Sequence, residues 1–188
     1  KMPYDAVKDL APIVVLARAP VVFVTGATTP YKTLADAVNA GKARPGQVNF
    51  ASPGNGTVSH LASELFQKAA GIKTQHVPYK GAAQALTDLI SGTVELYMGS
   101  VPTLLGHIKQ GKLRALAVTS AGRVDDIPSV PTIAESGYKG FDAVTWFGLV
   151  APMGTPKEAI AKINAEFNKA LKQPELAKRL GDEGADPA

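Results

Sequence analysis

The stretch 52–57, with the sequence Ser-Pro-Gly-Asn-Gly-Thr, has the residue types of a loop that binds an anion. A β-prone run precedes it and a helical pattern follows it, so it is expected to join a strand to the N-terminus of a helix. Asn55 and Thr57 are the candidate N-caps, and Gly54 and Gly56 let the backbone approach a ligand closely. The first free amides of such a helix attract a carboxylate or a phosphate. The alternative is a turn in which the glycines serve geometry alone.

A second set of side chains, outside this stretch, has the chemistry to contact the same ligand. His60 lies one turn into the predicted helix, where it either reaches a ligand or hydrogen-bonds to the backbone as a packing residue. Tyr79 and Lys80 follow the next predicted strand, where a lysine neutralises a carboxylate and a tyrosine hydrogen-bonds to one. The alternative for Lys80 is a solvated surface lysine. Trp146 and Phe147 either line a cleft between lobes or pack in a core.

The sequence lacks the motifs of the common catalytic and cofactor sites. The pattern at 54–59 falls one residue short of the dinucleotide-binding fingerprint, and neither a Gly-Lys-Ser/Thr phosphate loop nor a Gly-x-Ser-x-Gly elbow is present. The histidines His60, His76 and His107 lie far apart in the sequence, so no metal site is expected. No catalytic residue and no cofactor are therefore predicted.

Composition restricts the class of protein further. The chain has 188 residues, 45% of them hydrophobic, which is enough for one domain with a core or for two small lobes. Its net charge of +4 is scattered and only 6% of the residues are aromatic, so nucleic-acid binding is not expected. Cysteine is absent, which excludes disulfides and thiolate metal sites. No apolar run reaches membrane-spanning length, and residues 1–9 contain no signal-peptide core.

Strand and helix patterns alternate along the chain, which predicts an α/β domain with largely parallel strands. A run of apolar residues at 10–24 fits either two buried strands or one long bent strand that crosses between lobes. Further strands are expected at 48–51, 73–79, 94–98, 113–119 and 143–150. Helices are expected to open at 29–33, after the loop 52–57, at 82–90, from Ser100, from Pro156 and at 174–180. Ligands of open α/β sheets bind at the carboxyl ends of strands, so the loops 52–57, 79–81 and 99–101 are the candidate site.

Hydrophobic periodicity predicts which faces of these elements are buried. The strand 143–150 is expected to be buried, and 181–188 is expected to contain no closing element. The helix after Thr57 is predicted to face inward with Leu61, Leu65, Phe66 and Ala69, and the helix after Pro156 with Ile160, Ile163, Phe167 and Leu171.

Several motifs together resemble one known family across essentially the whole chain. They are Pro3-Tyr4-Asp5, Lys8-Asp9-Leu10-Ala11-Pro12-Ile13, Ala51-Ser52-Pro53-Gly54-x-Gly56-Thr57-x-x-His60-Leu61-Ala62, Val77-Pro78-Tyr79-Lys80-Gly81, 111–119, Val130-Pro131-Thr132-x-x-Glu135-x-Gly137 and Ala151-Pro152-x-Gly154-Thr155-Pro156. Their order and spacing resemble the Bug family of TctC-like extracytoplasmic solute receptors. The resemblance implies a two-lobed periplasmic binding protein of the type II, Venus-flytrap kind. Such a protein delivers a small carboxylate to the membrane subunits of a tripartite tricarboxylate-type transporter, without chemistry of its own.

The resemblance also implies how this chain is divided. Family members are about 300 residues long, so the chain is expected to be truncated at both ends. Residues 1–20 would be a remnant of the first lobe and the crossover, 21–142 the complete second, ligand-binding lobe, and 143–188 an incomplete returning segment of the first lobe. An exposed interlobe face would favour a homodimer of the fragment.

The ligand-binding residues follow from the resemblance position by position. They are Ser52, Gly54, Asn55, Gly56, Thr57, Ser59, His60, Tyr79, Lys80 and Gly81, with Ser100 and Trp146 added from their loop positions. The amides at 54–57 would hold one carboxylate by charge-assisted hydrogen bonds. Two alternatives remain: an enzyme that acts on a carboxylate or phosphate at the same helix N-terminus through His60 or Lys80, and a sensor module fused to an output domain.

Overall fold

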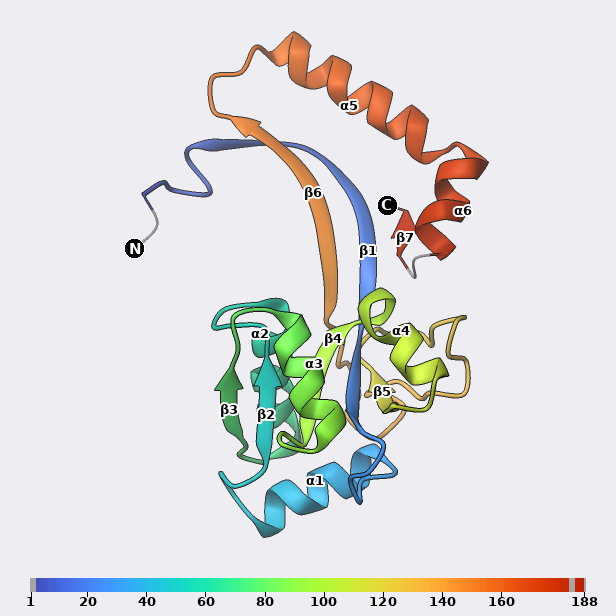
Figure 1. The fold of residues 1–188 in the computed structure, drawn as a ribbon. Helices are drawn as coiled ribbons and strands as arrows, with labels where there is room; N and C mark the ends of the chain where they lie inside the picture. Colours follow the sequence, from blue (N-terminus) through green and yellow to red (C-terminus); the bar gives the residue numbers. More distant parts are fainter. Residues whose placement is uncertain (1–2, 183–184, 188) are drawn as a thin grey trace. The chain divides into compact units, whose positions relative to one another are not determined.

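The computed structural model of the chain describes residues 3–182 and 185–187, which form alternating strands and helices (Figure 1). The strands are β1 (Leu10–Gly26), β2 (Asn49–Ser52), β3 (Gln75–Pro78), β4 (Leu96–Ser100), β5 (Leu113–Val118), β6 (Val144–Pro152) and β7 (Asp186–Pro187). The helices are α1 (Leu34–Ala43), α2 (Val58–Ala70), α3 (Ala82–Ser91), α4 (Val101–Lys109), α5 (Lys157–Leu171) and α6 (Pro174–Asp182). The α/β class predicted from the alternating patterns is confirmed.

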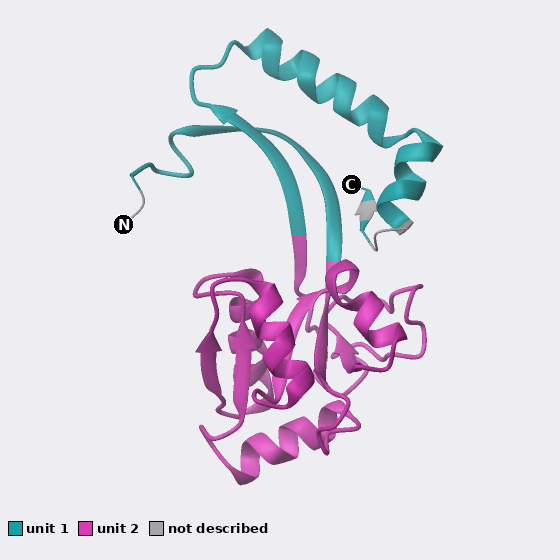
Figure 2. Cartoon of the chain, in the orientation of Figure 1, with its two compact units in different colours: residues 1–19, 146–188 teal, residues 20–145 magenta. Residues whose placement is uncertain are grey.

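The chain divides into two compact units (Figure 2). Unit 2 comprises residues 20–145, and unit 1 comprises residues 1–19 together with 146–188. Both boundaries fall inside strands, because β1 and β6 each contribute residues to both units. The run 10–24 is therefore part of a single strand of 17 residues, and the alternative of two strands is wrong.

Unit 2 contains a five-membered run of strands in the order β3-β2-β4-β1-β5. The strand β2 pairs in parallel with β3 and with β4, as the helical crossovers α2 and α3 require. The ladders that β1 forms with β4 and β5 are antiparallel, so β1 alone runs against the other strands of this run. The expectation of a largely parallel sheet holds except beside β1.

Helices cover both faces of this sheet, and consecutive residues of β1 supply the two cores. Val21 and Phe23 lie in one core with buried residues of α1, α2 and the segment around Ile133. Val22 and Val24 lie in the other core, with buried residues of α3 and α4. A strand that is buried on both faces needs apolar residues at every position, which explains the continuous hydrophobic run that β1 shows in the sequence.

The helix ends in unit 2 follow local capping rules. Thr33 caps α1 in a reciprocal capping box with Asp36, and Thr57 caps α2 by accepting a hydrogen bond from the His60 amide. Of the two candidate caps of α2, Thr57 is therefore the cap. Gly71 ends α2 in the left-handed conformation that a C-terminal glycine allows.

The predicted inward face of α2 is wrong in three of its four residues. Leu61 and Leu65 are 58% and 48% exposed, and Ala69 is exposed as well; only Phe66 is buried as expected. The buried face consists instead of Ser59, Ala62, Ser63, Phe66, Gln67 and Ala70. Four of these six residues have small side chains, so the pattern of large apolar residues indicated the wrong side of the helix.

In unit 1 the predicted burial of β6 and α5 is wrong. Trp146 and Phe147 of β6 are 64% and 50% exposed, and Ile163 and Phe167 of α5 are also exposed, with only Leu171 of the α5 stripe fully buried. The physical reason is that the described part of unit 1 supplies no further layer to cover these faces, although the Asn164 side chain of α5 donates a hydrogen bond to the Ile13 carbonyl at 2.6 Å.

The C-terminal residues of unit 1 contain an element that the sequence did not predict. The strand β7 pairs antiparallel with β1, with Pro187 opposite Ala17 and Asp186 opposite Arg18. Residues 183, 184 and 188 of the same stretch lie outside the described residues. Over the described ranges, no helix is both long enough and apolar enough to span a bilayer.

Candidate functional site

The candidate site lies in unit 2, where β2, β3 and β4 end and α2, α3 and α4 begin (Figure 1). Because β2 lies between β3 and β4 and runs parallel to both, the three carboxyl ends are neighbours at one edge of the sheet. The three predicted loops, 52–57, 79–81 and 99–101, are thus brought to this edge together. An edge of this kind is where open α/β sheets bind ligands.

The loop 52–57 is held in shape by its own polar atoms. The Ser52 hydroxyl donates to the Gly54 carbonyl at 3.1 Å and accepts from the Gly54 amide at 3.2 Å, and the Thr57 hydroxyl donates to the same carbonyl at 2.8 Å. Gly54 and Gly56 have φ angles of 152° and 76°, which side chains with a Cβ rarely adopt. The two glycines are required by the backbone of this loop.

The loop 79–81 is tied to the loop 52–57. The Tyr79 amide donates to the Ser52 carbonyl at 2.9 Å, and the Gly81 amide donates to the Pro53 carbonyl at 3.0 Å. A Cβ on Gly54 would lie 3.4 Å from the Tyr79 carbonyl oxygen, so the two backbones are in close contact. The N-termini of α2 and α3 are therefore presented side by side.

These two helix N-termini offer amide hydrogens to a ligand. The Val58 and Ser59 amides of α2 have no hydrogen-bond partner among the described residues, and Gly81 caps α3 without a side-chain hydrogen bond. Partial positive charge collects at such ends and attracts an anion. The Ser59 hydroxyl is buried and donates to the Met98 carbonyl, so only the amide of Ser59 faces the site.

The third helix N-terminus is a poorer donor. Pro102 stands in the first turn of α4 and has no amide hydrogen, and the Ser100 hydroxyl is bonded to the Thr103 hydroxyl at 2.8 Å. The N-cap of α4 makes no side-chain capping bond. Ser100 therefore contributes less to an anion site than loops 52–57 and 79–81.

The two side chains of the loop 79–81 differ in their availability. The Tyr79 hydroxyl donates to the Asp88 carboxylate of α3 at 2.7 Å. Burial, together with the hydrogen bond to Asp88 and the charge of Asp88, raises the pKa of Tyr79 to about 12. Lys80 is exposed and forms no hydrogen bond or ion pair within the described ranges. Lys80 is therefore the cation of this edge that is free to meet a carboxylate.

The histidines of α2 and β3 meet although the sequence places them 16 positions apart. The rings of His60 and His76 stack with centroids 4.0 Å apart and an interplanar angle of 6°. His60 Nδ1 accepts the Gly56 amide at 3.1 Å, and His76 Nε2 lies 2.6 Å from the Ser52 hydroxyl. Each ring therefore contacts one end of the loop 52–57.

Sequence reasoning treated His76 only as a distant histidine. The signal that points to its position is the register of the sheet, in which His76 pairs with Phe50 and shares its face. Phe50 belongs to the core under α2, so a histidine at this register position faces the first turns of α2. Asp88, the partner of Tyr79, was missed as well.

Two of the residues predicted to bind the ligand remain, Asn55 and Trp146. Asn55 is exposed at the tip of the loop 52–57. Trp146 lies on β6 and belongs to unit 1, whereas the loops 52–57 and 79–81 belong to unit 2. Among the described residues, no group of three or more His, Asp or Glu side chains is arranged to hold a metal ion.

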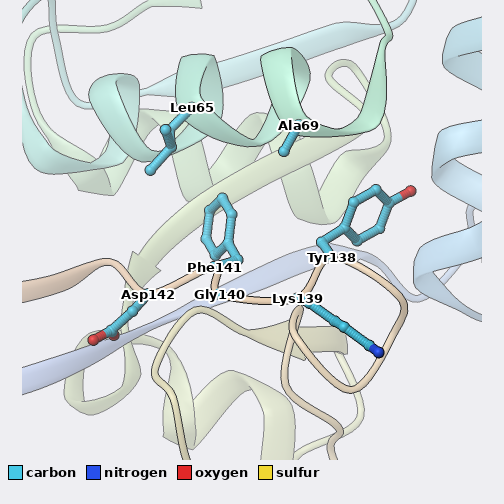
Figure 3. A pocket seen from close by; sticks show the side chains of 7 residues that line it. All are labelled: Leu65, Ala69, Tyr138, Lys139, Gly140, Phe141 and Asp142. Atoms are coloured by element: carbon cyan, nitrogen blue, oxygen red, sulfur yellow. The ribbon is translucent and has the colours of Figure 1, made fainter.

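A separate cavity of about 320 Å³ lies on the outer side of α2 (Figure 3). Leu65 and Ala69 of α2 face Tyr138 and Phe141 across it, with Lys139, Gly140 and Asp142 completing its lining. None of the loop residues predicted to bind the ligand lines this cavity. The exposed Leu65 that the periodicity placed in the core forms part of its wall.

Comparison with known proteins places this arrangement in a family. The family model described as the tripartite tricarboxylate transporter family receptor matches residues 1–188. A protein of a Pseudomonas species, named for the tcbD-tcbE intergenic region, is 39% identical over all of this chain and 56% of its own length, and protein BugT of Bordetella pertussis is 38% identical over 99% and 57%. The chain thus spans about half the length of these curated relatives.

Solved structures agree with this assignment. An R. palustris protein with adipate superposes with a TM-score of 0.92 at 34% identity, covering 100% of this chain and 62% of its own. The periplasmic binding protein BugD superposes with a TM-score of 0.87 at 32% identity over 98% and 62%, and MatC from Rhodopseudomonas palustris with bound malate gives 0.87 at 31% over 98% and 63%. The predicted periplasmic-binding-protein fold, one lobe with part of another, is confirmed. The chain belongs to the tripartite tricarboxylate transporter family of receptors.

Proposed function

We propose that this chain is the ligand-binding part of an extracytoplasmic solute receptor that holds a small carboxylate at the ends of β2 and β3. One observation carries the proposal: the unpartnered amides of Val58 and Ser59, at the start of α2, and the free cation of Lys80 lie at the same edge, where the loops 52–57 and 79–81 hydrogen-bond to each other. Amides at a helix N-terminus and a lysine together satisfy the oxygens and the charge of a carboxylate.

The relatives support the class of ligand. Two similar proteins of known structure are described with adipate and with bound malate, both small dicarboxylates. The family and its structural neighbours are solute-binding receptors. By extension, the whole protein to which this chain corresponds is a periplasmic receptor that binds its ligand without transforming it and hands it to the membrane subunits of a tripartite transporter.

The proposal is tested by calorimetric titration of the 188-residue chain with malate, adipate and citrate. Replacement of Lys80 by Gln should weaken the binding of the best ligand roughly threefold to tenfold, because it removes one charge-assisted contact. Lys73→Gln is the matched control, since Lys73 is also exposed but precedes β3 at the opposite end of the strand. An equal loss in both variants, or no heat with any carboxylate, would contradict the proposed site.

A second measurement addresses catalysis. After prolonged incubation with the protein, the bound carboxylate should be recovered unchanged, as judged by the proton NMR spectrum of the solution. Any new resonance that grows with time and disappears in the Lys80→Gln variant would replace the receptor by an enzyme that uses the same edge.

A further inference from the structure

The stacked rings of His60 and His76 lie at the edge of the sheet that carries the candidate site. The two rings come from different elements, α2 and β3, and each bonds to the loop 52–57. His60 Nδ1 receives the Gly56 amide at 3.1 Å, and His76 Nε2 lies 2.6 Å from the hydroxyl of the buried Ser52. The loop is therefore held at both of its ends by one pair of titratable rings.

The hydrogen bonds define the protonation state in which this arrangement exists. A ring nitrogen that accepts an amide hydrogen carries no proton, so the bond from the Gly56 amide requires a bare Nδ1 on His60, whose Nε2 is 3.9 Å from the Glu64 carboxylate. A proton added to Nδ1 would face the Gly56 amide hydrogen, and this bond would be lost. Two charged rings with centroids 4.0 Å apart would also repel each other.

The groups around His76 favour its neutral form. Burial lowers the pKa of His76, the neighbouring His60 lowers it further, and Glu64 has the opposite effect. His60 and Glu64 both come from α2, while β2 places the uncharged Ser52 hydroxyl 2.6 Å from His76 Nε2. A histidine whose pKa is lowered on folding contributes stability above its unfolded pKa, and this contribution is lost as the pH falls towards the folded pKa.

The Ser52 hydroxyl gives its hydrogen to the Gly54 carbonyl, so His76 Nε2 is the donor in the bond to Ser52. We propose that His76 is a positioning residue of the ligand site: this bond to Ser52 and the stack with His60 hold the loop 52–57 in the form that presents the α2 amides. Protonation of both rings releases this form, because they then repel each other and the Gly56 amide loses its acceptor. The relevance to ligand binding rests on the function proposed above. The positioning of the loop 52–57 by His76 is independent of that proposed function, and it can be measured without any ligand.

The direct test is an NMR titration of the 188-residue chain from about pH 8 to about pH 5, a window chosen around the ordinary pKa of histidine. The Gly54 amide, which donates to the Ser52 hydroxyl, is the reporter of the loop. In the wild type its resonance should shift with the same midpoint as the His76 ring. A Gly54 resonance that ignores the His76 midpoint would overturn the proposal.

Variants separate positioning from a general loss of structure. In His76→Gln the side-chain amide can still bond to Ser52 but does not titrate, so Gly54 should keep its neutral wild-type position and lose the His76 transition. In His76→Leu the bond is absent, so Gly54 should be displaced at every pH. His107→Gln, on α4, is the matched histidine control and should titrate like the wild type. Equal behaviour of the Gln and Leu variants would contradict a positioning role.

The ligand arm uses malate as the probe. The affinity of the wild type should fall about tenfold between pH 7.5 and pH 6, the amount expected when one hydrogen bond that shapes the site is lost, and that of His76→Gln should fall less. His107→Gln reports any change caused by ionisation of malate itself. An affinity that rises on acidification would overturn the proposed release. If malate does not bind at any pH, the proposed function fails for this ligand, and the NMR arm still decides the role of His76.

Discussion

Replacement of Thr57 by Val should destabilise unit 2 by about 2 kcal/mol. The Thr57 hydroxyl accepts the His60 amide at 3.4 Å and donates to the Gly54 carbonyl at 2.8 Å. Valine has the same shape and retains neither bond. Loss of the N-cap costs about 1 kcal/mol, and loss of the bond to Gly54 costs about as much again.

The magnitude can be checked by two measurements. Urea unfolding followed by far-UV circular dichroism gives the free energy of unfolding, and for a chain of 188 residues a loss of about 2 kcal/mol corresponds to a fall in melting temperature of roughly 5 °C. Hydrogen exchange localises the change: amides in the first turns of α2 should exchange faster in Thr57→Val, whereas those of α5 should be unaffected.

Thr57→Ser is the matched control, because serine retains the hydroxyl and caps helices as well as threonine does. It should lose less than about 0.5 kcal/mol. The capping argument would be refuted by a Thr57→Val protein as stable as the wild type. It would also be refuted by a Thr57→Ser protein as unstable as Thr57→Val, since the methyl group and not the hydroxyl would then determine the effect.

Three further predictions concern other parts of the chain. The amides of residues 32 and 33 and the hydroxyl of residue 33 lower the pKa of Asp36, so its stabilising effect is present above its ordinary value of 3.8 and lost as the pH falls through the folded pKa. The difference in urea midpoint between the wild type and Asp36→Asn should accordingly shrink from pH 5 to pH 3. Tyr79→Phe should cost about 1 kcal/mol of unfolding free energy, because Asp88 loses its partner, and an unchanged stability would show that water replaces the hydroxyl without loss. The exposed Trp146 and Phe147 should make the chain associate as its concentration rises, and sedimentation velocity that gives a monomer at every concentration would contradict this.

The order of elements in unit 2 and the location of its loops could be predicted because the signals are local. The helix expected to open at 29–33 begins after its cap Thr33, and the helix expected after the loop 52–57 begins after its cap Thr57. Caps, glycines and short-range periodicity depend on neighbours along the chain. The three loops followed from the same signals, since the carboxyl end of each strand is defined by where the next helix begins.

The features that the sequence did not predict depend on neighbours in space. The direction of β1 relative to β4 is set by the topology of the whole sheet, and the exposure of β6 and α5 is set by what covers them. An apolar stripe shows that a face suits burial; it contains no information on whether another element lies against it.

The mistaken face of α2 and the missed role of His76 have one physical cause. Periodicity gave weight to Leu61 and Leu65, but Ala62, Ser63 and Ala70 face the sheet. Small residues at a packing interface allow two elements to approach more closely than leucines would, because interaxial distance depends on the side chains at the contact. A close α2 lets the first-turn His60 stack directly on His76 of β3.

The substitution Ala62→Leu, which the hydrophobic pattern alone would tolerate, should therefore push α2 away from the sheet and separate the two rings. The Gly54 resonance should then lose the His76 transition. A wild-type titration in Ala62→Leu would show that the stack does not depend on the small-residue interface.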